Sequence, residues 1–132
     1  MHNFKELKIW KRGISLCIDI YKLTDKFPVE ERFNLISQLK RAGVSVPSNI
    51  AEGSGRNHNK EFNQFLGIAR GSLFELQTQL IISEQLEFIT SEESENHQKE
   101  IEDLIRMINS FQSSLHGVSE PETEYLPTNA QV

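Results

Sequence analysis

The sequence predicts an all-α protein: an antiparallel up-down four-helix bundle in a single domain. Apolar residues recur at spacings of three and four through four long segments, short turns separate these segments, and no run alternates as a strand does. At 132 residues the chain can bury one core without staples. We predict that the bundle covers residues 1–117 and that residues 118–132, with two prolines and three glutamates, form a disordered acidic tail.

The first helix is predicted near Leu7–Lys26, and it has two apolar lines about 120° apart. The first is a heptad-like seam, made of Leu7, Trp10, Ile14, Cys17 and Tyr21. The second is made of Ile9, Leu16, Ile20, Leu23 and Phe27. An outer helix of a small bundle needs only one such face, so the surplus predicts contact with another subunit. Because Cys17 lies on the seam, we expect it to pack in the core and not to act as a nucleophile.

The second helix is predicted to follow Phe27–Pro28 and to run to about Gly55, with Pro47 inside it. An internal proline removes one backbone hydrogen bond, which predicts a kink near Gly43–Pro47. The alternative is two shorter helices divided at Val46. The kink is favoured because the apolar and polar lines keep their phase across the proline. Glycines at the end of the segment are typical of a helix C-terminus.

The third helix is predicted over Lys60–Glu87, with two glycines opposite its core line, Gly67 and Gly71. Each glycine costs a helix up to about 1 kcal/mol relative to alanine, so the pair indicates the close approach of another backbone. That neighbour would be another subunit, and ordinary tolerance of glycine is the alternative. The candidate oligomer interface consists of Ile9, Leu16, Ile20, Gly67, Gly71, Phe74 and Thr78.

The fourth helix is predicted over Ser91–His116. Thr90 and Glu93 have the spacing of a capping box, in which each side chain satisfies the other residue's backbone N–H. Gly117 is placed to end the helix. The predicted core line is Ile101, Leu104, Ile108, Phe111 and Leu115.

A polar stripe runs beside the apolar line of the second helix. Its members are Gln38, Arg41, Ser45, Asn49, Glu52 and Arg56. A solvated face is one interpretation, but such faces favour long Lys and Glu side chains, whereas Ser and Asn are weak helix formers. The stripe therefore also suggests a groove, a hydrogen-bonded contact or a lined pore. We expect Asn49 and Glu52 to join a buried network, and Arg41 to contact another helix, a subunit or a phosphate.

The net charge of −5 conceals an asymmetry between the two halves. Residues 1–72 hold 12 Lys/Arg against 7 Asp/Glu, whereas residues 73–132 hold 2 against 12. This division permits a basic face for nucleic acid, or alternatively the two halves attract each other within or between bundles. The candidate nucleic-acid-binding residues are Lys8, Lys11, Arg12, Lys40, Arg41, Arg56, Lys60 and Arg70.

Catalytic, metal and membrane chemistry find little support in the sequence. A single cysteine excludes an intramolecular disulfide and a cysteine zinc cluster. A di-metal carboxylate site is not expected either, because no glutamate is followed by a histidine three residues later. We expect the four histidines, His2, His58, His97 and His116, on the surface. No secretory signal is recognisable and no apolar run approaches the ~18 residues of a membrane span, so we expect a cytoplasmic protein. The sequence thus predicts a non-enzyme with no cofactor, metal or small-molecule substrate.

Several runs together carry a resemblance: FKELKIW, QLKRAGVSVPSNIAEGSGR, KEFNQFLGIARGSLFELQTQL and LEFIT. From Phe4 to Leu115 the chain is similar to the bacterial four-helix-bundle family of 23S rRNA intervening-sequence proteins, whose molecular role is not established. It is more distantly similar to the accessory variability protein of diversity-generating retroelements, a pentameric barrel that binds RNA and its reverse transcriptase. The resemblance implies a homopentamer with RNA or a nucleic-acid enzyme as partner. His58 departs from the family, which often has a capping serine there.

Two classes of function therefore remain. The first is an RNA-associated accessory factor, which the basic surplus and the resemblance favour. The second is an oligomeric protein-interaction scaffold with no role in nucleic-acid binding, which the overall negative charge favours. The salt dependence of RNA binding discriminates between them.

Overall fold

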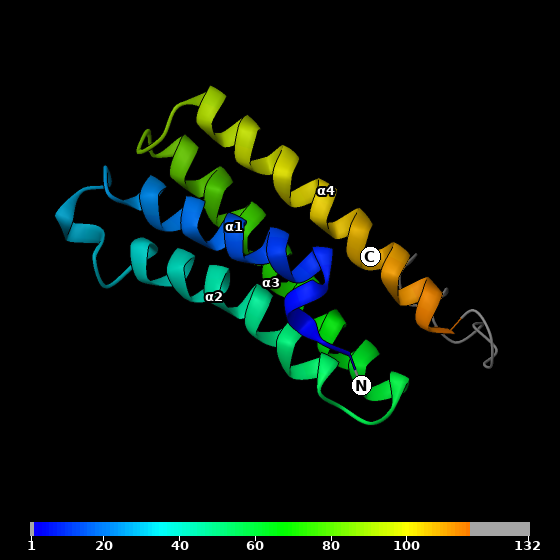
Figure 1. Cartoon of the computed structure of the whole chain (residues 1–132). Helices are drawn as coiled ribbons and strands as arrows, with labels where there is room; N and C mark the ends of the chain where they lie inside the picture. Colours follow the sequence, from blue (N-terminus) through cyan, green and yellow to red (C-terminus); the bar gives the residue numbers. More distant parts are fainter. Residues whose placement is uncertain (1, 117–132) are drawn as a thin grey trace.

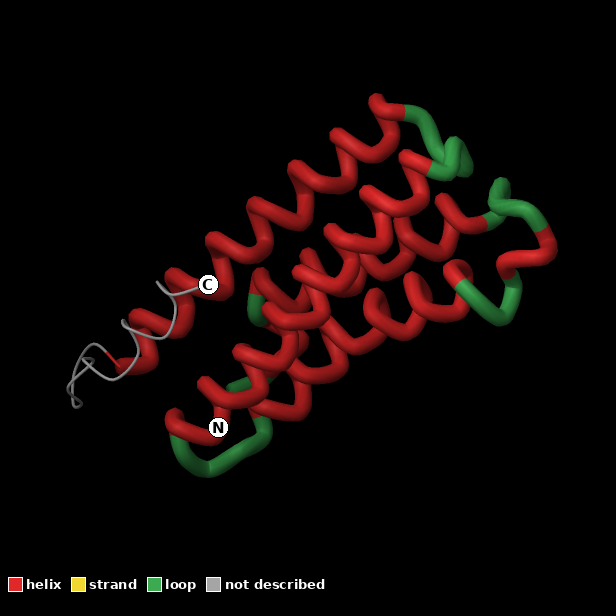
Figure 2. The backbone as a smooth tube through the Cα atoms, turned by 180° about the vertical axis from the view of Figure 1, so that it is seen from behind, coloured by secondary structure: helices red, strands yellow, loops and turns green. Residues whose placement is uncertain are grey.

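The structure, a computed structural model, describes residues 2–116. The predicted tail and Gly117 lie outside the described residues. Successive α-helices lie side by side, joined by short turns, and the chain runs along them in alternating directions (Figure 1). Figure 2 shows the same bundle from behind, with loops at its two ends. The helices are α1 (Lys8–Thr24), α2 (Leu35–Ser54), α3 (Asn59–Gln85) and α4 (Ser91–His116), with short 3-10 turns η1 (Phe4–Glu6) and η2 (Val29–Glu31).

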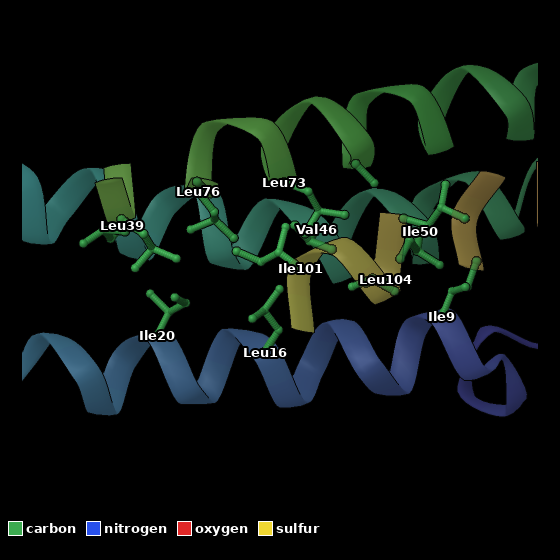
Figure 3. Close-up of a cluster of buried hydrophobic side chains, with 14 of the residues drawn as sticks. Ile9, Leu16, Ile20, Leu39, Val46, Ile50, Leu73, Leu76, Ile101 and Leu104 are labelled. Atoms are coloured by element: carbon green, nitrogen blue, oxygen red, sulfur yellow. The ribbon is translucent and has the colours of Figure 1, made fainter. Parts of the chain in front are cut away.

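The described part of the chain contains no strand, and the predicted all-α four-helix bundle is confirmed. Each helix contributes one line of apolar side chains to a common core (Figure 3). From α4 this line includes Ile101, Leu104 and Ile108, as the spacing predicted.

The face of α1 that enters the core differs from the prediction. Ile9, Leu16 and Ile20 are at most 3% exposed and point into the bundle (Figure 3), so these three side chains cannot form the predicted subunit interface. Part of the expected seam faces outward instead, with Tyr21 42% exposed. The physical reason is Gly13, which shares the inner face and lets α1 approach α2 closely.

A single helix α2 runs through Pro47, so the alternative of two shorter helices is wrong. The predicted kink stays a prediction. Pro47 is buried at the contact with α1, where a Cβ added to Gly13 would lie 3.4 Å from the Pro47 Cβ. The helix begins at Leu35, later than expected, because η2 occupies the turn after Pro28.

The glycines near the end of α2 serve packing more than helix termination. Gly55 follows the helix in a right-handed conformation, with φ −86°, and not in the left-handed conformation of a glycine cap. Gly53 lies inside the helix, where an added Cβ would be 2.7 Å from the Phe65 Cβ and 2.8 Å from the Phe62 Cδ1. No side chain fits there without movement of α3.

The two ends of the α3–α4 hairpin are held by different side-chain contacts. The capping box is present, since Glu93 N–H donates to Thr90 Oγ1 at 3.1 Å and Thr90 N–H donates to Glu93 Oε1 at 2.9 Å. At the start of α3 neither neighbouring asparagine caps the helix, because the N-cap position is His58 and it makes no side-chain capping bond. Asn59 instead donates to the Leu115 carbonyl at 3.1 Å, which joins the start of α3 to the end of α4.

None of the helices in residues 2–116 is both long enough and apolar enough to cross a membrane.

Gly53→Ala is predicted to destabilise the protein by roughly 1–3 kcal/mol, because the new methyl group overpacks the contact with Phe62 and Phe65. Gly43→Ala is the matched control in the same helix, since its Cβ would meet ordinary contacts starting at 3.7 Å. The control should be neutral or gain up to about 1 kcal/mol from helix propensity. Chemical denaturation of both variants measures the difference, and equal midpoints would contradict the packing argument.

Candidate functional site

The polar stripe of α2 lies along α3, where a second polar line faces it. Ser72 Oγ donates to Ser45 Oγ at 2.8 Å, which fixes the register of the two helices. The Arg56 guanidinium lies 4.7 Å from the centre of the Phe65 ring. We call this surface the polar seam. It consists of Gln38, Arg41, Ser45, Asn49 and Glu52 on α2, Arg56 in the turn after it, and Ser72, Glu75 and Gln79 on α3.

The middle of the polar seam is a small, half-buried hydrogen-bond network. Asn49 Nδ2 donates to the Ser45 carbonyl at 2.8 Å and to Ser45 Oγ at 2.9 Å. With the hydroxyl of Ser72 this network links α2 to α3. Short side chains are needed here because the two helices lie close together.

Glu52 does not join this network, contrary to expectation. Its side chain is 57% exposed and forms an ion pair with Arg56 at 3.0 Å, one helical turn away. No hydrogen bond connects Asn49 with Glu52 in the described part of the chain. The ion pair is solvent-exposed, and such pairs contribute about 0–1 kcal/mol.

The other end of the polar seam opens into a cavity of about 310 Å³ between the first half of α2 and the second half of α3. Gln79 is only 7% exposed, and its Oε1 has no hydrogen-bond partner within residues 2–116. Arg41 and Glu75 both line the cavity but form no ion pair with each other. We call this space the seam cavity, and its lining residues are Phe33, Ser37, Gln38, Arg41, Ala42, Ser45, Glu75 and Gln79.

Sequence reasoning missed the α3 side of this site and the aromatic residue at its rim. Ser72, Glu75 and Gln79 were not singled out, although their spacing of three and four repeats that of the α2 stripe. Phe33 was not singled out either, because it precedes the helix and belongs to no periodic line. Its exposed fraction is 84%.

The candidate nucleic-acid-binding residues divide into paired and unpaired groups. Arg12 lies 3.9 Å from Asp103, and Arg56 pairs with Glu52. Arg70 donates to Asn109 at 2.9 Å and also to Gln112, and burial lowers the pKa of its guanidinium. The residues without an ion pair in the described chain are Lys8, Lys11, Lys40, Arg41 and Lys60. Of these, Lys40 lies over the Tyr21 ring, 4.8 Å from its centre.

The structure brings five of the eight candidates to one end of the bundle. The start of the chain reaches the α2–α3 turn there, with His2 N–H donating to the Ser54 carbonyl at 3.0 Å (Figure 1). Lys40 and Arg41 lie toward the opposite end on α2, and Arg70 lies in the middle of α3. We call the first group the basic end, and its members are Lys8, Lys11, Arg12, Arg56 and Lys60.

Ion pairs between helices of the same chain neutralise part of the charge asymmetry. Lys26 pairs with Glu93, and Arg12 approaches Asp103, so basic residues of α1 and its following turn contact acidic residues of α4. The hydrogen bond from Lys26 is the main cause of a lowered pKa for the Glu93 carboxyl. Attraction between the two halves, one of the two interpretations of the sequence, therefore operates within the chain.

The outer face of α3 carries the remaining interface candidates. A Cβ added to Gly67 or Gly71 would meet nothing within 4 Å, so no neighbour within the described chain explains these glycines. Phe74 is 51% exposed beside them, and Thr78 donates its hydroxyl to the Phe74 carbonyl at 3.0 Å. Phe74 and Thr78 also border a groove of about 650 Å³ between α3 and α4.

The residues with catalytic or metal-binding potential are dispersed. In residues 2–116 no three His, Cys, Asp or Glu side chains lie together as a metal site would require. Burial raises the pKa of the Cys17 thiol, which opposes thiolate chemistry. His116 is 5% exposed and so buried, contrary to the expectation that all four histidines lie on the surface.

Comparisons with known proteins agree with this architecture. A family model described as 23S rRNA-intervening sequence protein matches residues 5–110. A crystal structure at 1.70 Å resolution of a protein with unknown function, from the S23 ribosomal protein family of Bacteroides thetaiotaomicron VPI-5482, has a similar fold with a TM-score of 0.70. The identity is 23%, and the likeness covers 79% of this chain and 97% of that one. At that identity the likeness shows the fold alone. No curated protein matches the chain.

Asn49→Ala is predicted to cost about 1–3 kcal/mol, because it removes both hydrogen bonds to Ser45 in a half-buried site. Glu52→Ala is the matched control on the same stripe and should change stability by no more than about 0.5 kcal/mol. Urea denaturation of the two variants measures both values. Equal effects would mean that the middle of the seam behaves as ordinary solvated surface.

Proposed function

Because the chain belongs to the 23S rRNA-intervening sequence protein family, we propose that it is a non-enzymatic, homo-oligomeric accessory protein that binds RNA in the bacterial cytoplasm. The observation that carries the proposal is the basic end, whose cations belong to parts of α1, the α2–α3 turn and α3 that lie at one end of the bundle. An enzyme that acts on the same RNA is a second candidate partner.

The basic end has the character of a phosphate-binding surface. Lys8, Lys11 and Lys60 are exposed and are not neutralised by any acid of the described chain. Each lysine that contacts a phosphate releases condensed counterions, which favours binding at low salt. The paired residues of the same group, Arg12 and Arg56, can exchange an exposed carboxylate for a phosphate at little cost.

Assembly is supported by the outer face of α3. Large apolar side chains at about half exposure are common along this helix, and the glycines beside them leave room for another backbone. These apolar residues are Ile68, Phe74, Ile81, Ile82 and Leu86. We propose that Gly67, Gly71, Phe74 and Thr78 contact a second copy of the chain, and the number of five subunits is taken from the family resemblance.

A protein-interaction scaffold without RNA is the alternative function. The same exposed apolar residues on α3 favour it, because they would serve a different protein as well as a second copy. An RNA-binding protein needs the lysines of the basic end, whereas a scaffold does not. Substitution of these lysines therefore distinguishes the two functions.

A triple variant, Lys8→Gln with Lys11→Gln and Lys60→Gln, is predicted to weaken RNA binding and flatten its salt dependence. Each lost phosphate contact should reduce the slope of log K against log salt by about 0.7–0.9. Fluorescence anisotropy with structured and single-stranded RNA at several salt concentrations measures the slope. Lys99→Gln, an exposed change on α4, is the control and should leave it unaltered. A wild-type protein with no salt-dependent RNA binding would favour the scaffold.

Gly71→Leu is predicted to disrupt assembly while leaving the subunit helical, since a Cβ added at Gly71 meets nothing within 4 Å in the described residues. Sedimentation velocity at micromolar concentration and far-UV circular dichroism measure the two properties. Lys99→Leu adds the same side chain on α4, away from the α3 glycines, and should preserve the oligomer. An intact oligomer in Gly71→Leu would show that the glycines do not mark the subunit contact.

A further inference from the structure

The seam cavity has the features of a binding site for a small polar group. Three kinds of side chain line it. Arg41 is an exposed cation, Gln79 and Glu75 carry acceptor oxygens, and Phe33 is an exposed aromatic ring. We propose that the seam cavity binds a single nucleotide whose base carries an exocyclic amino group. The nucleotide is either free in solution or an unpaired residue of an RNA strand, and the RNA case rests on the proposed function.

The buried amide of Gln79 carries the argument furthest. The residue is 93% buried, yet its Oε1 has no hydrogen-bond partner in residues 2–116. Buried acceptors are nearly always satisfied, because an unsatisfied one is costly. The hydroxyl of Ser72 donates to Ser45, and no hydroxyl in residues 2–116 donates to Gln79 Oε1. A donor from a ligand would complete the site.

Glu75 offers a second acceptor. Its side chain is exposed, lines the cavity and takes part in no ion pair with Arg41 or any other residue described. An ionised carboxylate only accepts hydrogen bonds, so the N–H of a ligand can replace a water there. Two acceptors in one cavity match an amino group with its two N–H bonds. Uracil presents a carbonyl oxygen in place of an amino group, which would face these acceptors unfavourably.

The charge and the aromatic ring fit the rest of a nucleotide. Arg41 is exposed and free of ion pairs, and a guanidinium binds phosphate through two parallel hydrogen bonds. Phe33 is 84% exposed at the rim, where an unstacked base can lie against its ring. The Arg32 guanidinium already lies 5.7 Å from the centre of that ring, which shows that the ring accepts planar, cationic neighbours.

The volume restricts the ligand to one residue of a strand. At about 310 Å³ the cavity is at the lower limit of small-molecule sites, and it admits one base but not a duplex. An extended strand is compatible with the site, because the polar seam continues from this cavity along α2 toward Arg56 and Phe65.

The test is a titration of ¹⁵N-labelled protein with AMP, CMP, GMP and UMP, followed by amide chemical shifts. We expect shifts of residues around Arg41 and Gln79, and affinities for the three amino-bearing nucleotides about 10-fold or more above that for UMP. No binding of any nucleotide at millimolar concentration would overturn the proposal, and so would equal affinity for UMP.

Two variants assign the effect to the cavity. Gln79→Met keeps the volume but removes the acceptor, so it should melt no lower than wild type while nucleotide affinity falls about 10-fold. Arg41→Gln changes an exposed residue, so it keeps the fold and tests the phosphate contact even if Gln79→Met is poorly folded. Gln64→Met, an exposed change on α3, is the control. Unchanged nucleotide affinity in both cavity variants would overturn the proposal.

RNA oligomers separate this inference from the proposed function. We expect single-stranded adenosine and cytidine oligomers to bind more tightly than uridine oligomers, and Gln79→Met to abolish that preference.

If RNA binding depends on the lysines of the basic end but not on Gln79 or Arg41, the cavity proposal fails and the proposed function stands. If AMP binds in the cavity and no RNA binds, the free nucleotide is the ligand and the proposed function fails. If the cavity variants change only the sedimentation coefficient, a second copy occupies the site and the proposal is overturned.

Discussion

The close packing of α2 between α1 and α3 is the constraint on which the rest of the structure depends. At three of the contacts that α2 makes with its neighbours, one partner is a glycine. Gly13 lies against Pro47, and an added Cβ at Gly43 would lie 3.7 Å from the Cys17 Sγ. Gly53 lies against the Phe62 ring and the Phe65 Cβ of α3, at a spacing that leaves no room for a methyl group. These contacts fix the rotation of α2 about its axis and bring its apolar line fully into the core.

The polar seam is a consequence of that fixed rotation. With the apolar line inward and the glycines against the neighbours, the stripe can only lie along the edge of α3. In its middle the helices are close, so only hydroxyls and an amide fit, and they bond to one another across the contact. Toward both ends longer side chains appear, with an ion pair at Glu52 and Arg56 and an open cavity around Arg41. The part of the seam available to a ligand is therefore the part that α3 does not close.

Much of this fold follows from periodicity, but the pairing of faces does not. Spacing indicated four helices, the capping box of α4 and the stripe of α2, because each of these depends on residues close in sequence. The choice between the two apolar lines of α1 depends on which helix lies opposite. One signal in the sequence was not used. Gly13 lies on the same line as Ile9 and Leu16, and a glycine on that line indicates the face of α1 that another helix approaches closely. The seam cavity was beyond sequence reasoning because its residues come from two segments, 33–45 and 75–79, that are far apart in the sequence.

The distribution of charge distinguishes the faces of the bundle. The outer surface of α4 is acidic, with Glu95, Glu100 and Glu102 exposed, so a polyanion is repelled from that side. The groove beside it, lined by Phe74 and Ile81, suits a protein contact in which apolar area is buried. The basic end and Arg41 lie on the other helices, where RNA can approach without crossing the acidic surface. Lys60 lies on the same side of α3 as Gly67, because seven residues are about two helical turns, whereas Lys8 and Lys11 are on α1 and Arg41 is on α2. Assembly through α3 would thus leave the proposed RNA-binding residues of α1 and α2 outside the subunit contact.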